Sequence, residues 1–313
     1  MEIYKTQSPI ANKSNWLLSL FVIVLVTIGT LLLLQGIAVL LIPPLFAIPL
    51  DELPALLTLK STSPHARMAF LFIQGFGGGL GFLAAAYIIA KWIDKADMDR
   101  QQQLDRFKFM GIAITVVIML GAVLFNALLI DWNAHVKFPE FLSAFEKFAR
   151  ESEDELMAMT KFLTDFQNTG EFLMGLLVIG ILAGIGEEVL FRGVLQPKLQ
   201  SYTGNPHLGI WLSAFIFSAI HLQFYGFLPR MFLGAVFGYL YHYSGSLGYP
   251  IVAHILNNSF TVVMIYLNSL GKVEFNIEET DQVSLPLALL GIGGMIIGFR
   301  FFKEKMTIRP IDG

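Results

Sequence analysis

The chain lacks cysteine and has few charged residues. None of its 313 residues is cysteine, and Asp, Glu, Lys and Arg together make up 14% of the sequence. The absence of cysteine excludes disulfides, thiolate metal ligands and a cysteine nucleophile, so any metal must be held by His, Asp, Glu or Asn. Soluble domains carry roughly 25% charged residues, and the shortfall here predicts a chain that lies mostly in lipid. The net charge of −3 gives no indication of a nucleic-acid partner.

Apolar runs take the place of the missing charge. Hydrophobic residues make up 55% of the sequence, and the mean hydropathy is +0.64. We therefore expect an all-α, polytopic membrane protein in which residues 1–313 form a single integral membrane domain with about eight transmembrane helices. The expected spans cover residues 16–42, 68–89, 109–130, 172–195, 208–222, 231–243, 251–267 and 285–302. The last four are shorter than the ~20 residues that a perpendicular span requires.

Lys and Arg are unevenly distributed among the segments between these spans. They are more numerous in the segments that share a side with the N-terminus, and a long segment such as 131–171 weighs little in the positive-inside rule. We therefore expect both termini in the cytoplasm, with the protein in the plasma (inner) membrane.

Residues 131–171 form the one sizeable stretch outside the expected spans. Phenylalanines recur there at helical spacing among many acidic residues, which predicts amphipathic helices lying over the membrane surface. This insert is either a cap that packs on the bundle or a lid that controls entry of a substrate.

The apolar run 172–195 contains ionisable residues, which are expensive at bilayer depth and usually functional. Glu188 and Arg192 are four residues apart, so they are expected to meet on one helix face and form a supporting ion pair. Glu187 lies about 100° around the helix from Glu188 and has no local partner. It is our first candidate for a general base.

Two further runs carry polar side chains. His221 follows Phe217 by four residues, and His254 precedes Asn258 by the same spacing. The pair on the second run offers ring nitrogens, together with an amide able to donate a hydrogen bond to an oxyanion. The plainer interpretation is that these residues only fasten helices together through hydrogen bonds.

Glu187, His221, His254 and Asn258 can supply every group that amide hydrolysis requires. In one scheme Glu187 and His221 activate water directly. In the other, a zinc ion held by His221, His254 and Glu187 acidifies a bound water. The residues alone leave both schemes open, together with a non-proteolytic role as a transporter, a proton pathway, or a catalytically silent scaffold or immunity protein.

Three patterns on successive runs resemble those of one family. Glu187-Glu188-x-x-x-Arg192, Phe217-x-x-x-His221 and His254-x-x-x-Asn258 are similar to the motifs of the CAAX protease and bacteriocin-processing (CPBP, or ABI) family. The resemblance spans a core at about 172–267, whereas the first three spans and the insert lie outside it. It implies an eight-helix intramembrane endopeptidase whose catalytic cavity opens toward the cytoplasm.

The resemblance also implies a role for each motif residue. Glu187 and His221 would activate water, and His254 and Asn258 would be oxyanion donors or metal-site residues. Glu188 and Arg192 would support them. The implied substrate is a membrane protein or lipidated peptide in the bilayer.

Overall fold

A computed structural model describes residues 4–97, 100–276 and 283–307. Apart from an isolated bridge between Lys5 and Asp97, these residues form helices and loops, which confirms the all-α prediction. The helices, with their 3-10 and π-helical segments, are η1 Pro9–Ala11, η2 Lys13–Asn15, α1 Trp16–Phe46, η3 Leu50–Glu52, α2 Leu53–Leu57, α3 Ala66–Ile73, η4 Gln74–Gly79, α4 Leu80–Tyr87, η5 Ile88–Ile93, α5 Arg100–Asp105, α6 Phe109–Ala134, η6 Glu140–Leu142, α7 Ser143–Thr164, α8 Thr169–Gly175, η7 Leu176–Leu182, α9 Ala183–Leu190, η8 Phe191–Leu195, α10 Gln196–Thr203, α11 Pro206–Ala219, α12 Phe227–Ser244, α13 Gly248–Ser269 and α14 Leu285–Met306.

Each of the eight expected spans overlaps a helix or a continuous run of helical segments. Among the described residues, six helices are long and apolar enough to cross a membrane: Lys13–Phe46, Ala66–Ile93, Phe109–Ala134, Thr169–Thr203, Gly248–Ser269 and Leu285–Met306. The other two expected spans correspond to α11, an apolar helix of 14 residues, and α12, with 18 residues. The protein is therefore a polytopic helical membrane protein.

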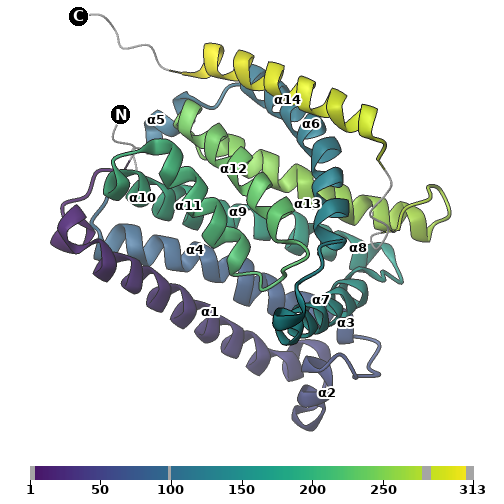
Figure 1. The fold of residues 1–313 in the computed structure, drawn as a ribbon. Coiled ribbons are helices and arrows are strands. Elements are labelled where there is room, and N and C mark those ends of the chain that lie inside the picture. The colour runs from purple at the N-terminus through teal and green to yellow at the C-terminus, as the bar shows by residue number, and fades with distance from the viewer. Residues whose placement is uncertain (1–3, 98–99, 277–282, 308–313) are drawn as a thin grey trace, which may run out of the picture.

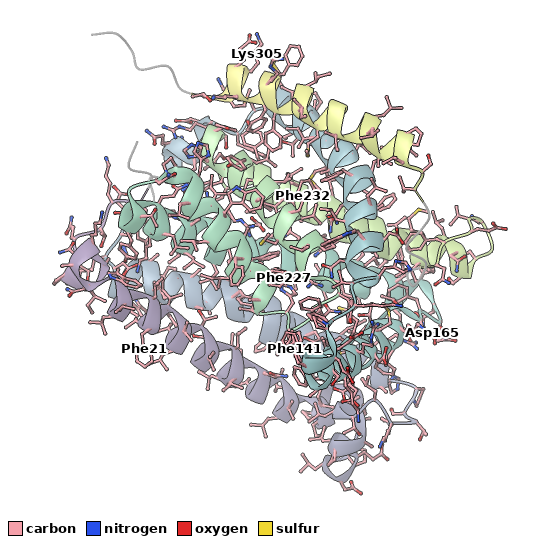
Figure 2. The ribbon with its side chains drawn as sticks, in the orientation of Figure 1. Phe21, Phe141, Asp165, Phe227, Phe232 and Lys305 are labelled. Carbon is pink, nitrogen blue, oxygen red and sulfur yellow. The ribbon has the colours of Figure 1, made fainter. Side chains whose placement is uncertain are left out.

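The outer surface of the bundle is apolar. In α1, only 17% of the most hydrophobic window is buried inside the protein. Phe21, which is 59% exposed, points away from the bundle in Figure 2. Because a helix satisfies its own backbone hydrogen bonds, such a surface is stable against lipid.

The helix that carries the predicted carboxylates lies inside the bundle. Its segment α9 packs between α4 and α13, while α1 lies along α4, and α6 pairs with α14 (Figure 1). The hairpin of α11 and α12 packs against α10 and η8. Glu187 and Glu188 are therefore surrounded by helices from distant parts of the chain.

Wider turns interrupt this long helix on both sides of the carboxylates. The π-helical segments η7 and η8 flank α9, so the register of hydrogen bonds changes just before and just after Glu187 and Glu188. Such π turns are frequent at functional sites.

Glycine lets α9 approach η4 closely. A Cβ atom on Gly186 would lie 2.4 Å from the carbonyl oxygen of Gly79, whereas one on Gly29 in α1 would meet nothing within 4 Å. Small residues at a helix crossing allow this packing, which lipid itself does not drive.

We expect Gly186→Ala to destabilise the protein by about 1–3 kcal/mol, because the added methyl group forces the backbones of α9 and η4 apart. Gly29→Ala is the matched control and should have little effect. The thermal unfolding midpoint of the purified protein in detergent measures both. Equal midpoints for the two variants would show that the approach of these helices is not tight.

Candidate active site

The two adjacent carboxylates of α9 have different surroundings. The side chain of Glu188 is fully buried, whereas that of Glu187 remains 14% exposed. Of the two, Glu187 is therefore the more accessible carboxylate.

Glu188 and Arg192 form the ion pair that their spacing predicts. Nη1 of Arg192 donates to Oε1 of Glu188 at 2.9 Å, and both side chains are fully buried. Nη2 of Arg192 donates to the carbonyl oxygen of Gly234 on α12 at 2.7 Å. The guanidinium also lies 4.9 Å from the ring centroid of Phe217 and 5.5 Å from that of Phe237. This pair therefore joins α9 to α11 and α12.

His254 completes a chain of polar contacts across α9 and α13. Its Nδ1 lies 2.8 Å from Oε1 of Glu188, and its Nε2 lies 3.9 Å from Oε2 of Glu187. An ionised carboxylate only accepts hydrogen bonds, so Nδ1 carries the proton and Nε2 of the neutral ring faces Glu187 with a lone pair. The ring stacks on Phe237 with centroids 4.9 Å apart. The contact with Glu188 is not predicted by either motif taken alone.

His221 lies outside the helix in which it was expected. The predicted span ran to residue 222, but α11 ends at Ala219, and His221 lies in the following turn, where its backbone N–H donates to Ser218. Leu222 then has a φ of 56°, in the left-handed region, which an α-helix does not continue through. Because this turn lies beyond the hydrogen-bond ladder of α11, its position depends on contacts with other elements.

Phe217 lies between the two histidine rings. Its centroid is 5.1 Å from that of His221 and 5.9 Å from that of His254. The carbonyl oxygen of Phe217 also accepts a hydrogen bond from Nδ1 of His221 at 2.7 Å, which leaves Nε2 of His221 without its proton in the neutral ring. The phenylalanine of the second motif therefore orients both imidazoles.

Asn258 forms a bond between helices. Its Nδ2 donates to the carbonyl oxygen of Ile179 on η7 at 3.1 Å, and its Oδ1 accepts from Nδ2 of Asn257 at 3.2 Å. Asn258 therefore does link α13 to η7 by a hydrogen bond, as the plainer interpretation expected. One of the two amide hydrogens remains for another acceptor, so the role of Asn258 as an oxyanion donor stays a prediction.

The predicted zinc ligands do not form a metal cage. Within the ranges 4–97, 100–276 and 283–307, no three His, Asp or Glu side chains are grouped so that they could hold a metal ion. The zinc site of His221, His254 and Glu187 therefore stays a prediction, and no step below passes through a metal.

The insert packs on the turn that carries His221. Phe138 and Phe145 contact the ring of Phe224 with centroids 4.8 and 5.6 Å away, and Arg150 of α7 lies 4.5 Å from the ring of Tyr225. In addition, α7 contacts α3, α8 and α13 at this end of the bundle (Figure 1). The insert thus packs on the bundle beside the turn that carries His221.

Asn133, near the end of α6, is hydrogen-bonded to the segment that follows the same turn. Its Nδ2 donates to the carbonyl oxygen of Phe224 at 3.1 Å, and its Oδ1 accepts from the backbone N–H of Leu228 at 3.0 Å. Only 1% of Asn133 is exposed, so neither backbone group finds water if the amide is removed.

We expect Asn133→Ala to destabilise the protein by about 1–3 kcal/mol and to lower any activity that depends on His221, because two buried backbone groups lose their partner. Asn126→Ala is the control: Asn126 is also buried on α6, but its Oδ1 has no hydrogen-bond partner in the described structure. Thermal unfolding midpoints and peptide-cleavage rates of both variants provide the measurement. A loss for Asn126→Ala as large as that for Asn133→Ala would contradict this role.

The structure adds functional candidates that the sequence did not single out. Phe237 and Asn133 are ordinary residues in apolar helices, and nothing in their spacing marks them. The sequence does mark Arg230 as a charged residue next to an apolar run, but the predicted span began at residue 231 and did not include it. The structure begins α12 at Phe227 and places Arg230 in its first turn.

Comparisons with known proteins agree with the predicted resemblance. Residues 169–260 match the family model of Rce1-like type II CAAX prenyl endopeptidases. The chain is 30% identical over 122 residues to the Bacillus subtilis (strain 168) protein named "Putative membrane peptidase YdiL", covering 39% of this chain and 46% of that protein. It is 29% identical over 85 residues to "Uncharacterized protein YpbD" of the same organism, covering 26% of this chain and 40% of that protein.

The chain thus spans less than half the length of these two relatives. No solved structure matches. The matched region contains all six residues of the predicted site, from Glu187 to Asn258, and confirms the resemblance to the CAAX protease family.

Proposed function

We propose that this protein is an intramembrane endopeptidase that hydrolyses a peptide bond of a membrane protein or lipidated peptide. The observation that carries the proposal is the position of Glu187. It is the accessible one of two adjacent carboxylates, and it faces Nε2 of His254 at 3.9 Å inside a bundle of apolar helices. An ionisable side chain is costly to bury in that setting, so such residues are usually functional.

In the proposed reaction, one water molecule donates hydrogen bonds to Glu187 and to Nε2 of His221. The water oxygen attacks the carbonyl carbon of the substrate while its proton passes to Glu187. Glu187 then protonates the leaving nitrogen as the C–N bond breaks, so the products are a carboxylic acid and an amine. The carboxylate thus ends the cycle in its starting state.

The oxyanion formed by this attack needs hydrogen-bond donors. The remaining amide hydrogen of Asn258 is one. Nε2 of His254 becomes a donor only when the ring is protonated, and the carboxylate of Glu188 at 2.8 Å stabilises that cation. The hydrogen bond from Arg192 holds the carboxylate of Glu188 in place for this task.

The distribution of Lys and Arg sets the proposed topology. With both termini in the cytoplasm of a plasma membrane, the insert would lie on the outer side, because α6 leads away from the side on which α1 begins. The chemistry of the substrate beyond its peptide bond, including any lipid group, belongs to this proposal.

Comparison of membrane proteomes tests the function directly. Cells that carry the wild-type chain should contain peptides with new termini that are missing from cells carrying Glu187→Gln. If the two proteomes show the same termini, the chain is not a protease of this kind. Elemental analysis of the purified protein separates the schemes: stoichiometric zinc that is lost in His254→Ala would favour the metal scheme over direct activation of water.

A further inference from the structure

A cavity of about 360 Å³ lies apart from the candidate active site, between α11, α12 and α14. It is lined by His207 of α11, by Tyr239 and Tyr243 of α12, and by side chains from residues 296–303 of α14. Its volume falls within the range of about 300–1,000 Å³ that small-molecule sites occupy. The residues proposed for peptide hydrolysis are not among those that line it, so a ligand bound there would not enter the proposed reaction.

The cavity carries positive charge without an acidic partner. Arg300 and Lys303 both line it, and no Asp or Glu is among its described lining residues. Within residues 4–97, 100–276 and 283–307, neither side chain forms a salt bridge, whereas the neighbouring Lys305 pairs with Glu304 at 3.0 Å. The cavity therefore attracts an anion.

Aromatic residues position the polar groups of the cavity. Nζ of Lys303 lies 5.3 Å from the ring centroid of Tyr243, which is within the range of a cation–π interaction. Nδ1 of His207 is hydrogen-bonded to the hydroxyl group of Tyr239 at 2.9 Å, which leaves Nε2 of the ring for another partner. The rings of Tyr239 and Tyr243 stack with centroids 5.8 Å apart. The ammonium and imidazole groups are thus both held against the tyrosines of α12.

Toward the middle of α14 the lining becomes apolar. Ile296 and Phe299 line the cavity there. Ile296, Ile297 and Phe301 are each more than half exposed, so this part of the cavity continues into the lipid-facing surface of α14. Ile296 precedes Lys303 by seven residues, which places the two about 10 Å apart along the helix. A ligand that fills the cavity must therefore combine an anionic group with a hydrocarbon chain.

The charged end of the cavity lies where lipid headgroups are expected. Arg300 and Lys303 belong to the last two turns of α14, which is long and apolar enough to cross a membrane. Figure 2 labels Lys305 at this end of the helix. Basic side chains near the end of a span reach the headgroup region, where tyrosine is also enriched. In the proposed topology this end of α14 faces the cytoplasm, the side on which the membrane surface is negatively charged.

We propose that this cavity binds a membrane phospholipid with an anionic headgroup, whose phosphate contacts Arg300 and Lys303 and whose acyl chain runs beside Ile296. Charge-assisted hydrogen bonds from these two cations to phosphate oxygens are of the stronger kind. A soluble phosphate would leave the apolar wall of the cavity uncovered. The lipid would contact three helices and hold α14 against the hairpin of α11 and α12.

Native mass spectrometry of the full chain, released from detergent with bound lipids, tests this site. The probes are dioleoyl phosphatidylglycerol and dioleoyl phosphatidylcholine, which have the same chains and differ in headgroup charge. The tightest site should prefer phosphatidylglycerol at least ~10-fold, because each basic group near an anionic lipid contributes about fivefold in affinity. Lys303→Gln should reduce the preference about fivefold, and Arg300→Gln combined with Lys303→Gln should remove it.

Lys305→Gln is the matched control. It removes the same charge two residues away on α14, from a side chain that is already paired with Glu304 and does not line the cavity. It should leave the preference unchanged. Equal losses for Lys303→Gln and Lys305→Gln would overturn the proposal, because they would show diffuse attraction to the positive end of the helix. Equal binding of the two lipids by the wild-type chain would overturn it as well.

Two further measurements separate a lipid from a soluble anion. Glycerophosphoglycerol, which is the same headgroup without its chains, should not displace bound phosphatidylglycerol even in large excess, and displacement would overturn the proposal in favour of a soluble ligand. Because a ligand that binds only the folded state stabilises it, the wild-type chain should unfold at a higher temperature in nanodiscs of phosphatidylglycerol than in nanodiscs of phosphatidylcholine. The same increase in the variant that lacks both Arg300 and Lys303 would contradict the site.

The lipid site does not rest on the proposed endopeptidase function. None of these measurements uses peptide cleavage, so either proposal can fail without the other.

Discussion

Glu187→Gln is expected to reduce peptide cleavage by about 10²–10⁴-fold, because glutamine cannot take a proton from water or return it to the leaving nitrogen. The substitution keeps the size of the side chain, and among the described residues Glu187 forms no hydrogen bond that joins two helices, so the thermal unfolding midpoint should change little. Rates with a peptide identified from the proteome comparison, measured in nanodiscs, provide the test.

The control for this prediction is Glu151→Gln. Glu151 is exposed on α7 and pairs loosely with Lys147 at 3.8 Å, so its replacement should leave cleavage intact. Cleavage by Glu187→Gln within a few-fold of the wild-type rate would remove Glu187 from the chemistry and shift attention to His254 as the base.

Glu188→Ala is expected to destabilise the protein by about 3–5 kcal/mol, because it leaves the fully buried guanidinium of Arg192 without its counter-charge. The matched comparison is Glu146→Ala, in which the lost partner is Arg150. The two pairs have the same spacing along a helix, but the second is largely exposed and should contribute little. Chemical or thermal unfolding of both variants measures the difference.

A double substitution separates the structural role of Glu188 from its chemical role. Glu188→Met together with Arg192→Leu removes both charges at once, and such replacements of buried pairs are often neutral or stabilising. We expect this variant to fold but to cleave poorly, since Nδ1 of His254 loses its carboxylate. Full activity in the double variant would show that the contact at 2.8 Å serves packing alone.

Contacts within one helix were predictable. Glu188 and Arg192 lie four residues apart, and helix geometry brings such side chains together wherever the helix is placed. The same reasoning applied to Phe217 and His221, but there the helix ends at Ala219, and the contact survives as a hydrogen bond from the imidazole to a backbone carbonyl. The weak point was the end of the element, because apolar runs specify helices better than they specify where a helix ends.

Contacts between helices were not predictable from spacing. The hydrogen bond of His254 to Glu188 depends on how α13 is rotated against α9, and the cap over residues 220–226 depends on where α7 packs. Both depend on tertiary packing, to which side chains such as Phe237 contribute and which periodicity does not encode.

By itself, the sequence determined that this is a helical membrane protein, which runs form its helices, and which residues share a helix face, because composition and a 3.6-residue period act locally. Only the tertiary structure decided that Glu187 is the more accessible carboxylate and that His254 is hydrogen-bonded to Glu188. Those facts depend on the relative rotation and depth of helices that are far apart in the chain.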